Sequence, residues 1–299
     1  MNSNLFKERI ASQIPAVKLL INSGYEYLTP NDCIEERGDT NTVILKDTLK
    51  KSLLKINSFS HNGKQLALPE GLIDDAIKEI ADWNNNNLRQ DNKDLYYHLI
   101  NGKGLTFLHE GDRRSAHLHF FDFKDISNNT FQVTEEFRVQ RVGRKDTYVP
   151  DIVIFVNGMP LASIECKKPG LPDAIKKSIE QTIRNQYRDG IPNFFIFQQL
   201  LGAVAGSTGA RYGSVGTPEE FWGTWKEDNF ENKEDELKGL VNKNIESKVK
   251  DKIFEFRHPA DRAIMEQKWN EGAREVTAQD QLLYFVFRPE RLLDIIHNY

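Results

Sequence analysis

Cysteine is scarce in this sequence, and a long apolar run is missing. Only two of the 299 residues are cysteines, Cys33 and Cys166, so a framework of several disulfide bonds is excluded. No apolar run approaches the ~20 residues that a membrane-spanning helix needs. The N-terminal segment carries Glu8 where a signal peptide would have an uninterrupted apolar stretch. We therefore expect a cytoplasmic protein that makes no contact with a membrane.

The sequence also has no excess of positive charge. Its formal net charge of −4 argues against a protein whose whole surface coats nucleic acid. Local basic faces are still possible, and two segments supply them: residues 138–145, with three arginines and a lysine, and residues 167–188, with six positive charges. Each segment is either a place where DNA phosphates bind or an ordinary solvated surface.

Apolar periodicity predicts helices in the first third of the chain. Residues 1–60 are expected to be mainly helical, and a further amphipathic helix is expected from about Glu70. The asparagine run Asn84–Asn87 is expected to end that helix as a solvated loop. A short helix is predicted over residues 94–100.

The pattern changes to strands after residue 104. Aromatic and β-branched residues predict strands between residues 105 and 166, among them 152–156 and 161–165. A helix is predicted from about residue 172 to 188, and the apolar segment 194–205 is expected to be a buried strand. Residues 226–252 are polar, which predicts a solvated helix or linker. The last residues are apolar again.

The segment richest in chemistry is PDIVIFVNGMPLASIECKKP, residues 150–169. Asp151 precedes one apolar strand, and Glu165 and Lys167 close the next. Hydrolysis of a phosphodiester requires oxygen ligands for Mg²⁺, a water that loses a proton near neutral pH, and a cation that offsets the charge of the transition state. Asp151, Glu165 and the backbone carbonyl of Cys166 offer the ligands, and Lys167 offers the cation. Taken alone, this short pattern also occurs in α/β proteins without a metal site.

Strand geometry turns this interpretation into a structural prediction. If Asn157-Gly158 formed a strict two-residue turn between regular strands, Asp151 would face away from Glu165. A three-residue connection (157–159) or a β-bulge would place the two carboxylates on one face. We therefore predict an odd-length loop or a bulge here, although Asn-Gly favours a tight turn. Pro160, which donates no ladder hydrogen bond, is consistent with such an irregularity.

Two further groups of side chains leave alternatives open. His117 and His119 alternate along a predicted strand with His109 nearby, but no third ligand accompanies them, so a polar strand face competes with a zinc site. Glu135 and Glu136 lie upstream of Asp151 and offer either an extra acidic group near the metal or ordinary exposed carboxylates.

Residues 150–169 closely resemble the segment of type I restriction endonuclease R subunits that carries their PD-(D/E)xK nuclease site. Further segments of the chain resemble that family in the same order: GYEYLTP (24–30), NNTFQVTEEFRV (128–139), EQTIRNQ (180–186), FWGTW (221–225) and RPERLLDII (288–296). The resemblance implies an α/β fold of the restriction-endonuclease type, with a mixed central sheet flanked by helices and a helical N-terminal layer.

The resemblance also implies roles for individual residues. Asp151 and Glu165 would bind Mg²⁺ together with the Cys166 carbonyl, and Lys167 would be the catalytic lysine. Many members carry a Gln-x-x-x-Tyr motif on the following helix; Gln181 fits its glutamine, but Asn185 stands where the tyrosine is expected, so the role of the nearby Tyr187 stays open. The DNA-binding or accessory residues would be Gln181, Lys168, Arg184 and Tyr187.

The family implies partners and a division of the chain. R subunits continue into motor domains that hydrolyse ATP, and this chain has no GxxxxGK[ST] motif, so ATP would be used only by a motor outside it. We expect a nuclease domain over residues 1–255, with a helical part to about 104 and a catalytic core over about 105–225. Residues 256–299 would connect it to the motor. The partners would be double-stranded DNA and the methylation and specificity subunits. The alternative is a non-catalytic module of the same fold that binds DNA or docks the motor.

Overall fold

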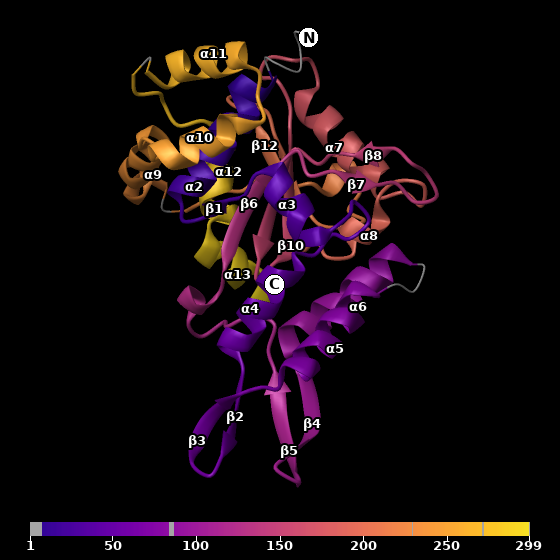
Figure 1. The fold of residues 1–299 in the computed structure, drawn as a ribbon. Coiled ribbons are helices and arrows are strands. Elements are labelled where there is room, and N and C mark those ends of the chain that lie inside the picture. The colour runs from indigo at the N-terminus through magenta and orange to yellow at the C-terminus, as the bar shows by residue number, and fades with distance from the viewer. Residues whose placement is uncertain (1–7, 84–86, 229, 271, 299) are drawn as a thin grey trace.

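The computed structural model describes residues 8–83, 87–228, 230–270 and 272–298 (Figure 1). Its α-helices are α2 (Ile14–Asn22), α3 (Pro30–Arg37), α4 (Lys46–Ile56), α5 (Glu70–Ala81), α6 (Leu88–Asn101), α7 (Ala174–Asn185), α8 (Pro192–Phe195), α9 (Glu234–Asn242), α10 (Ser247–Glu255), α11 (Pro259–Asn270), α12 (Ala278–Phe287) and α13 (Pro289–Asn298). A short π-helix, η1 (Arg9–Gln13), precedes α2. None of the described helices has the length and apolar character needed to cross a membrane.

Six strands form one central mixed sheet. Its strands, in spatial order, are β1 (Glu26–Tyr27), β6 (Phe131–Glu135), β9 (Ile152–Val156), β10 (Met159–Cys166), β11 (Leu200–Val204) and β12 (Ala210–Gly213). The pairs β1–β6 and β10–β11 are parallel, and the other three pairs are antiparallel. This confirms the expected mixed central sheet flanked by helices. Every residue of the two middle strands, β9 and β10, is buried, which explains why their sequences are almost continuously apolar.

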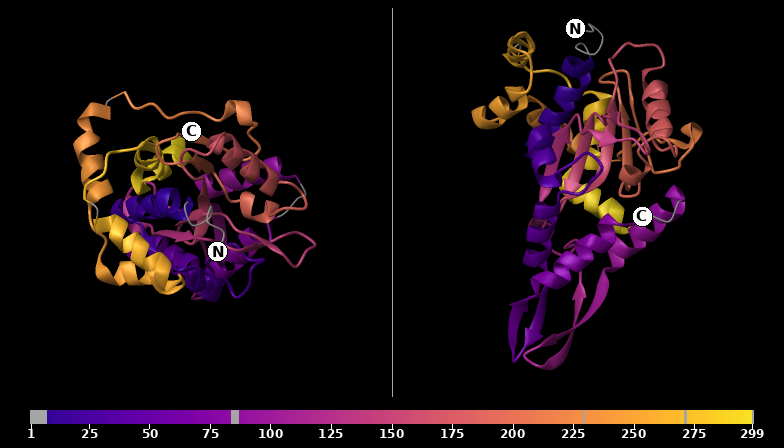
Figure 2. Two further views of the ribbon diagram at one scale, coloured as in Figure 1. Left: turned by 90° about the horizontal axis from the view of Figure 1, so that it is seen from above. Right: turned by 45° about the vertical axis from the view of Figure 1, so that its right-hand side comes forward.

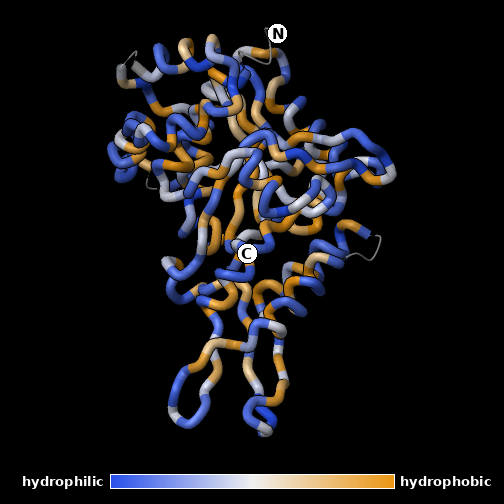
Figure 3. The backbone as a smooth tube through the Cα atoms, viewed as in Figure 1, coloured by the Kyte–Doolittle hydropathy of each residue, from blue (hydrophilic) through white to orange (hydrophobic). Residues whose placement is uncertain are grey.

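Helices cover both faces of this sheet. On one face, Ser163 and Glu165 of β10 lie beside Thr182 and Asn185 of α7. On the other face Phe287 of α12 lies next to β11, and α12 packs against α2. Figure 3 shows apolar residues concentrated along these central elements. The site described below therefore lies at the end of strands that are fully shielded from water.

A separate group of elements extends from one end of the molecule (Figures 1 and 2). It contains α5, α6 and two hairpins, β2–β3 (Ser58–His61 with Lys64–Ala67) and β4–β5 (Lys103–His109 with Asp112–Leu118). The remaining short pair, β7 (Val139–Gln140) with β8 (Thr147–Tyr148), lies beside the sheet body. We call the two hairpins β2–β3 and β4–β5 the hairpin arm.

The predicted helix from Glu70 is confirmed by α5, which buries Ile73, Ile77 and Ile80 along one face. Residues 84–86 of the asparagine run lie outside the described residues. Helix α6 is longer than the expected 94–100, because the side chain of Asn87 accepts a hydrogen bond from the Gln90 N–H and caps a start at Leu88.

Two expectations about local structure were wrong. Segment 194–205 is not one strand: Pro192 begins the short helix α8, and strand β11 starts only at residue 200. A short apolar run does not distinguish a buried helical turn from a strand, and proline favours the first turn of a helix. Residues 226–252 are not only solvated, because α9 buries Leu237 and Val241 at helical spacing. The expectation that residues 1–60 are mainly helical is confirmed for the described residues, most of which lie in η1, α2, α3 and α4, with only β1 and the start of β2 as strands.

The turn between β9 and β10 contains both a tight turn and a bulge. Asn157 and Gly158 have φ of 51° and 80°, which is the backbone of a two-residue hairpin turn, and Val156 pairs with Met159. Pro160 then pairs with Phe155, but the next pair is Ala162 with Ile154, so Leu161 is an extra residue.

From the bulge onward the register shifts by one residue. Ile164 pairs with Ile152, and the same register sets Glu165 opposite Asp151. The predicted bulge is therefore confirmed, while the alternative of a three-residue loop is not. The division of the chain at residues 104, 225 and 255 stays a prediction.

The close packing of the β9–β10 turn can be tested by a substitution at Gly158. A Cβ atom on Gly158 would lie 2.5 Å from the Leu45 carbonyl oxygen and 2.8 Å from the Leu49 nitrogen. We expect Gly158→Ala to lower the free energy of unfolding by about 1–3 kcal/mol, because a positive φ and a backbone clash coincide. Urea denaturation measures the change.

The matched control is Gly239→Ala in the middle of α9. There the φ is not in the left-handed region and nothing lies within 4 Å of the added atom. This substitution is expected to stabilise the protein by about 0.5–1 kcal/mol. Similar effects from the two substitutions would show that the turn at Gly158 is not restrained in this way.

Candidate active site

The three residues singled out in residues 150–169 meet where β9 begins and β10 ends. Oδ2 of Asp151 accepts a hydrogen bond of 2.7 Å from the backbone N–H of Cys166. Nζ of Lys167 donates to Oε1 of Glu165 and to the carbonyl oxygen of Cys166, both at 2.9 Å. Side chains from both strands thus form one cluster.

Pairing with β11 and packing of α7 hold the end of β10 in place. The backbone N–H of Lys167 donates to the Val204 carbonyl at 2.8 Å, which continues the strand pairing past Cys166. The hydroxyl of Ser178 on α7 donates to the carbonyl of Glu165 at 2.9 Å. Glu165 and Lys167 are two residues apart, so both side chains leave the same side of the extended chain.

Burial dominates the electrostatics of the cluster. It raises the pKa of Asp151 well above its ordinary value, and the neighbouring Glu165 carboxylate raises it further. Burial also raises the pKa of Glu165, against the opposing effect of Lys167. Burial alone would lower the pKa of Lys167, but Glu165 and Asp151 outweigh it, so this pKa lies above its ordinary value. In the metal-free site the lysine is a cation that stabilises two carboxyl groups which are otherwise costly to ionise.

Glu8 joins this cluster from the far end of the sequence. Its Oε1 lies 3.9 Å from Nζ of Lys167, and the backbone N–H of Lys168 lies close enough to lower the pKa of its carboxyl. Burial raises the pKa of Glu8, as does the Asp151 charge. The sequence pattern gives no sign that Glu8 belongs to the site, because no local spacing relates a residue at the start of the chain to a strand at residue 165.

The donor atoms of the site fit a hard divalent cation. Two carboxylates and one backbone carbonyl are gathered at the strand ends, and oxygen donors of this kind are what Mg²⁺ prefers. Of the donor atoms of Cys166, only the carbonyl suits such a site: the thiol is buried, and burial raises the pKa of that thiol well above its ordinary value.

Glu135 does not belong to the donor set. It is completely buried, and its oxygens accept hydrogen bonds from Tyr27 (2.9 Å), Gln13 (3.0 Å) and Arg257. Nε2 of Gln13 also donates to the Asp151 carbonyl at 3.3 Å, so this network positions the start of β9. Neither alternative foreseen for Glu135, a metal-side carboxylate or an exposed one, is correct. Glu136 forms an ion pair with Arg9 at 2.5 Å.

The residues expected to bind DNA or to be accessory have fewer contacts with the Asp151–Glu165–Lys167 cluster. Lys168 is half-buried beside Glu8. Gln181 is half-buried on α7, the Arg184 guanidinium lies 5.6 Å from the ring centre of Tyr148, and Tyr187 is exposed. Within the described ranges no hydrogen bond or ion pair joins Gln181, Arg184 or Tyr187 to the Asp151–Glu165–Lys167 cluster.

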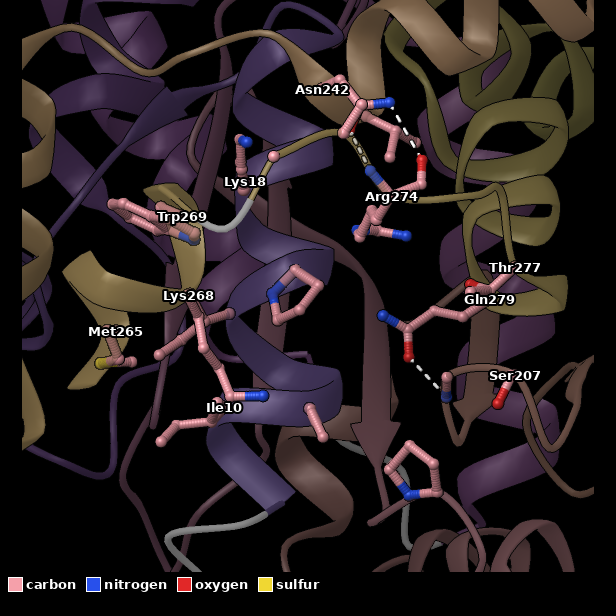
Figure 4. A pocket seen from close by; sticks show the side chains of 18 residues that line it. Ile10, Lys18, Ser207, Asn242, Met265, Lys268, Trp269, Arg274, Thr277 and Gln279 are labelled. Atoms are coloured by element: carbon pink, nitrogen blue, oxygen red, sulfur yellow. Dashed lines mark hydrogen bonds between the residues drawn. The ribbon is translucent and has the colours of Figure 1, made fainter.

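A cationic cavity of about 490 Å³ lies next to the site (Figure 4). Pro169 and Gly206 line one side, and Lys18, Lys268 and Arg274 are among the other lining residues. Arg274 is paired with Asp280 at 2.6 Å, but in the described part of the chain no acidic side chain lies within ion-pair distance of the two lysines. Burial lowers the pKa of Lys18, and so do nearby Arg274 and Lys250. The cavity therefore has unbalanced positive charge.

Comparisons with known proteins point to one group. A family described as the N terminus of the type I restriction enzyme R protein matches residues 6–221. The putative type I restriction enzyme MjaIXP endonuclease subunit of Methanocaldococcus jannaschii is 28% identical over 217 residues, covering 71% of this chain and 20% of the relative. The HindI endonuclease subunit of Haemophilus influenzae is 28% identical over 214 residues, covering 69% and 19%. The chain thus spans about a fifth of the length of these relatives.

The buried carboxylates generate a prediction about stability. In the metal-free protein we expect Asp151→Asn to raise the free energy of unfolding at neutral pH by about 0.5–2 kcal/mol, because it removes a buried charge beside Glu165. The asparagine oxygen still accepts the Cys166 N–H. Because the pKa of Asp151 is raised in the folded protein, its contribution to stability is greatest below the unfolded-state pKa and is lost as the pH rises through the folded-state pKa. In the Asp151→Asn variant, the free energy of unfolding should decline less as the pH rises.

Asp39→Asn is the control, for which we expect the opposite change in the free energy of unfolding. Backbone N–H groups of Thr42 and Asn41 hold the pKa of Asp39 below its ordinary value, so loss of that charge should destabilise the protein. Urea denaturation in a chelating buffer, from acid to neutral pH, measures both variants. Destabilisation by both substitutions would mean that the Asp151 charge is not strained in the folded state.

Proposed function

The chain belongs to the family of type I restriction enzyme R protein N-terminal regions, and from that premise we propose that it is a Mg²⁺-dependent nuclease module that hydrolyses DNA phosphodiester bonds. The observation that carries the proposal is the meeting of Asp151 and Glu165 across the β9–β10 pair, with Lys167 donating hydrogen bonds to the Glu165 carboxylate and the Cys166 carbonyl. The names of the relatives as endonuclease subunits support a nuclease in general.

We assign the fold to the PD-(D/E)xK type on the same grounds. The aspartate precedes one strand of the mixed sheet, and the Glu-x-Lys pair ends the adjacent strand. The following helix, α7, packs behind the second strand through Ser178.

Mg²⁺ would be held by Asp151, Glu165 and the Cys166 carbonyl. When bound, it polarises the phosphate and makes a water molecule more acidic. The role of Lys167 follows from its charge: because two carboxylates keep its pKa raised, it acts as a hydrogen-bond donor and cation rather than as a base. It orients the attacking water or stabilises charge on the phosphate oxygens. Glu8 offers a further carboxylate on the other side of the lysine.

DNA would be held by contacts to its phosphates. Lys168 adjoins the site, and the neighbouring cavity adds the charges of Lys18 and Lys268. We assign Arg184, Tyr187 and Gln181 to the more distant duplex, since α7 follows the catalytic strand. Such contacts position the DNA and read no base sequence.

The remaining activities of the assembly would reside elsewhere. The relatives are much longer than this chain and are named as subunits of type I restriction enzymes. We propose that the module works in a complex with methylation and specificity subunits, and that ATP is used only by motor domains outside residues 1–299.

The decisive test uses Lys167→Ala in the full-length subunit, within the reconstituted complex, on supercoiled DNA with Mg²⁺ and ATP. We expect nicking to fall by about 10²–10³-fold, the size of effect typical for loss of one transition-state donor. ATP-driven translocation should be unchanged. Lys51→Ala, an exposed lysine on α4, is the control and should cut normally.

Each other outcome has a clear meaning. Equal nicking by wild type and Lys167→Ala would overturn the assignment of this lysine. If the wild-type complex translocates but never cuts, the module serves only in DNA binding or docking.

A further inference from the structure

The tips of the hairpin arm bring two histidines and a glutamate together. His61 is the last residue of β2, and His109 is the last residue of β4. Glu110 follows in the turn to β5, with φ of 52°. The two hairpins belong to separate sheets, so only their packing creates this group.

The distances within the group are short. Nε2 of His61 lies 3.1 Å from Oε2 of Glu110. The ring centres of His61 and His109 are 4.9 Å apart, at an interplanar angle of 81°. One possible donor atom from each of the three side chains lies within 4.8 Å of the others, and in the described part of the chain no other group of three or more His, Cys, Asp or Glu residues converges in this way.

The surroundings hold the imidazoles but leave them chemically available. His61 is only 9% exposed, and its buried Nδ1 has no hydrogen-bond partner. The ring of His109 packs edge-on against Phe59 at 5.0 Å, which fixes its position. Among the described residues no hydrogen bond to a ring nitrogen of His109 is formed. The Glu110 side chain is 71% exposed, so the group opens to solvent and an ion can enter.

We propose that His61, His109 and Glu110 form a binding site for a divalent transition-metal ion of the Zn²⁺ type, which joins the two hairpin tips. Two imidazole nitrogens and one carboxylate are an established ligand set for Zn²⁺, with water in the fourth position. Imidazole favours such ions over Mg²⁺, so this site differs in kind from the oxygen-donor site at the central sheet. Nothing in the proposed nuclease function requires it.

The geometry needs only side-chain movement to accept the ion. Ligand atoms about 2.1 Å from a tetrahedral ion are about 3.4 Å from one another. The His61–Glu110 contact of 3.1 Å already has this spacing, and the spread of 4.8 Å closes by rotation of the exposed Glu110 and of His109. Asn62, whose side-chain nitrogen is 3.1 Å from Nε2 of His61, would turn away.

The competing explanation is a plain hydrogen bond or ion pair between His61 and Glu110. That contact leaves His109 without a function in the group. The neighbouring charges favour neither the metal site nor the plain contact, because one is positive and one negative: Lys64 lies opposite His61, and Asp112 lies opposite His109.

The histidines singled out in the sequence give a matched control. The rings of His117, on β5, and of His119, just after it, lie 4.7 Å apart, closer than those of the proposed site. Nε2 of His117 contacts the Asn101 carbonyl oxygen at 2.6 Å, and in the described ranges no carboxylate completes the pair. Proximity of two imidazoles alone would therefore predict metal binding at both places.

The test is a calorimetric titration of the whole chain with ZnCl₂ alone. We expect wild type and His117→Ala to bind one Zn²⁺ with the same affinity at this site. Both His109→Ala and Glu110→Gln should weaken that binding at least about tenfold. Glu110→Gln changes an exposed side chain of the same size, so it tests the ligand without disturbing the fold. Any Zn²⁺ bound at Asp151 and Glu165 is unaffected by these substitutions.

Cobalt provides a second measurement. The visible absorption of Co²⁺ bound in place of Zn²⁺ should appear in wild type and disappear in His109→Ala. The proposal is overturned if wild type and Glu110→Gln give the same titration curve, or if His117→Ala loses as much affinity as His109→Ala.

Discussion

Two carboxylates that lie side by side, Asp151 half-buried and Glu165 buried, need a cation, and this constraint organises the centre of the molecule. Asp151 and Glu165 approach each other only because Leu161 is an extra residue in β10. Lys167 then balances them from the same strand. Without the bulge, the pair would face opposite sides of the sheet and neither the lysine nor a shared metal ion could serve both. The tight turn at Asn157-Gly158 and the bulge therefore act together.

A second buried charge connects the site to the C-terminal helices. Glu135 on β6 is paired with Arg257, just after α10, and its remaining hydrogen bonds come from Tyr27 and Gln13. A buried ion pair is tolerated when its buried polar atoms have partners, and among the described residues neither Glu135 nor Arg257 has a buried side-chain nitrogen or oxygen without one. Because Gln13 also bonds to the Asp151 carbonyl, segments far apart in the sequence share one network with the start of β9.

The molecule offers two kinds of donor atoms at two separate places. Carboxylate and carbonyl oxygens gather at the ends of the middle strands, while imidazole nitrogens gather at the tips of the hairpin arm. The first set suits hard cations and phosphate chemistry, and the second suits a borderline ion with a structural role. A metal ion at the arm would join two hairpins that are otherwise held by packing such as that of Phe59 on Phe107.

The sequence by itself determined what depends on neighbouring residues. Period-two spacing placed Glu165 and Lys167 on one face, strand parity required the bulge, and helical spacing located α5. Only the tertiary structure decided that Glu8 lies near Lys167 and that Glu135 pairs with Arg257. It also brought His61 and His109 together. It also decided that the apolar segment 194–205 is divided between α8 and β11. The physical reason is that periodicity reports which side of an element is buried, whereas the partner that buries it, or pairs with its charge, comes from elsewhere in the chain.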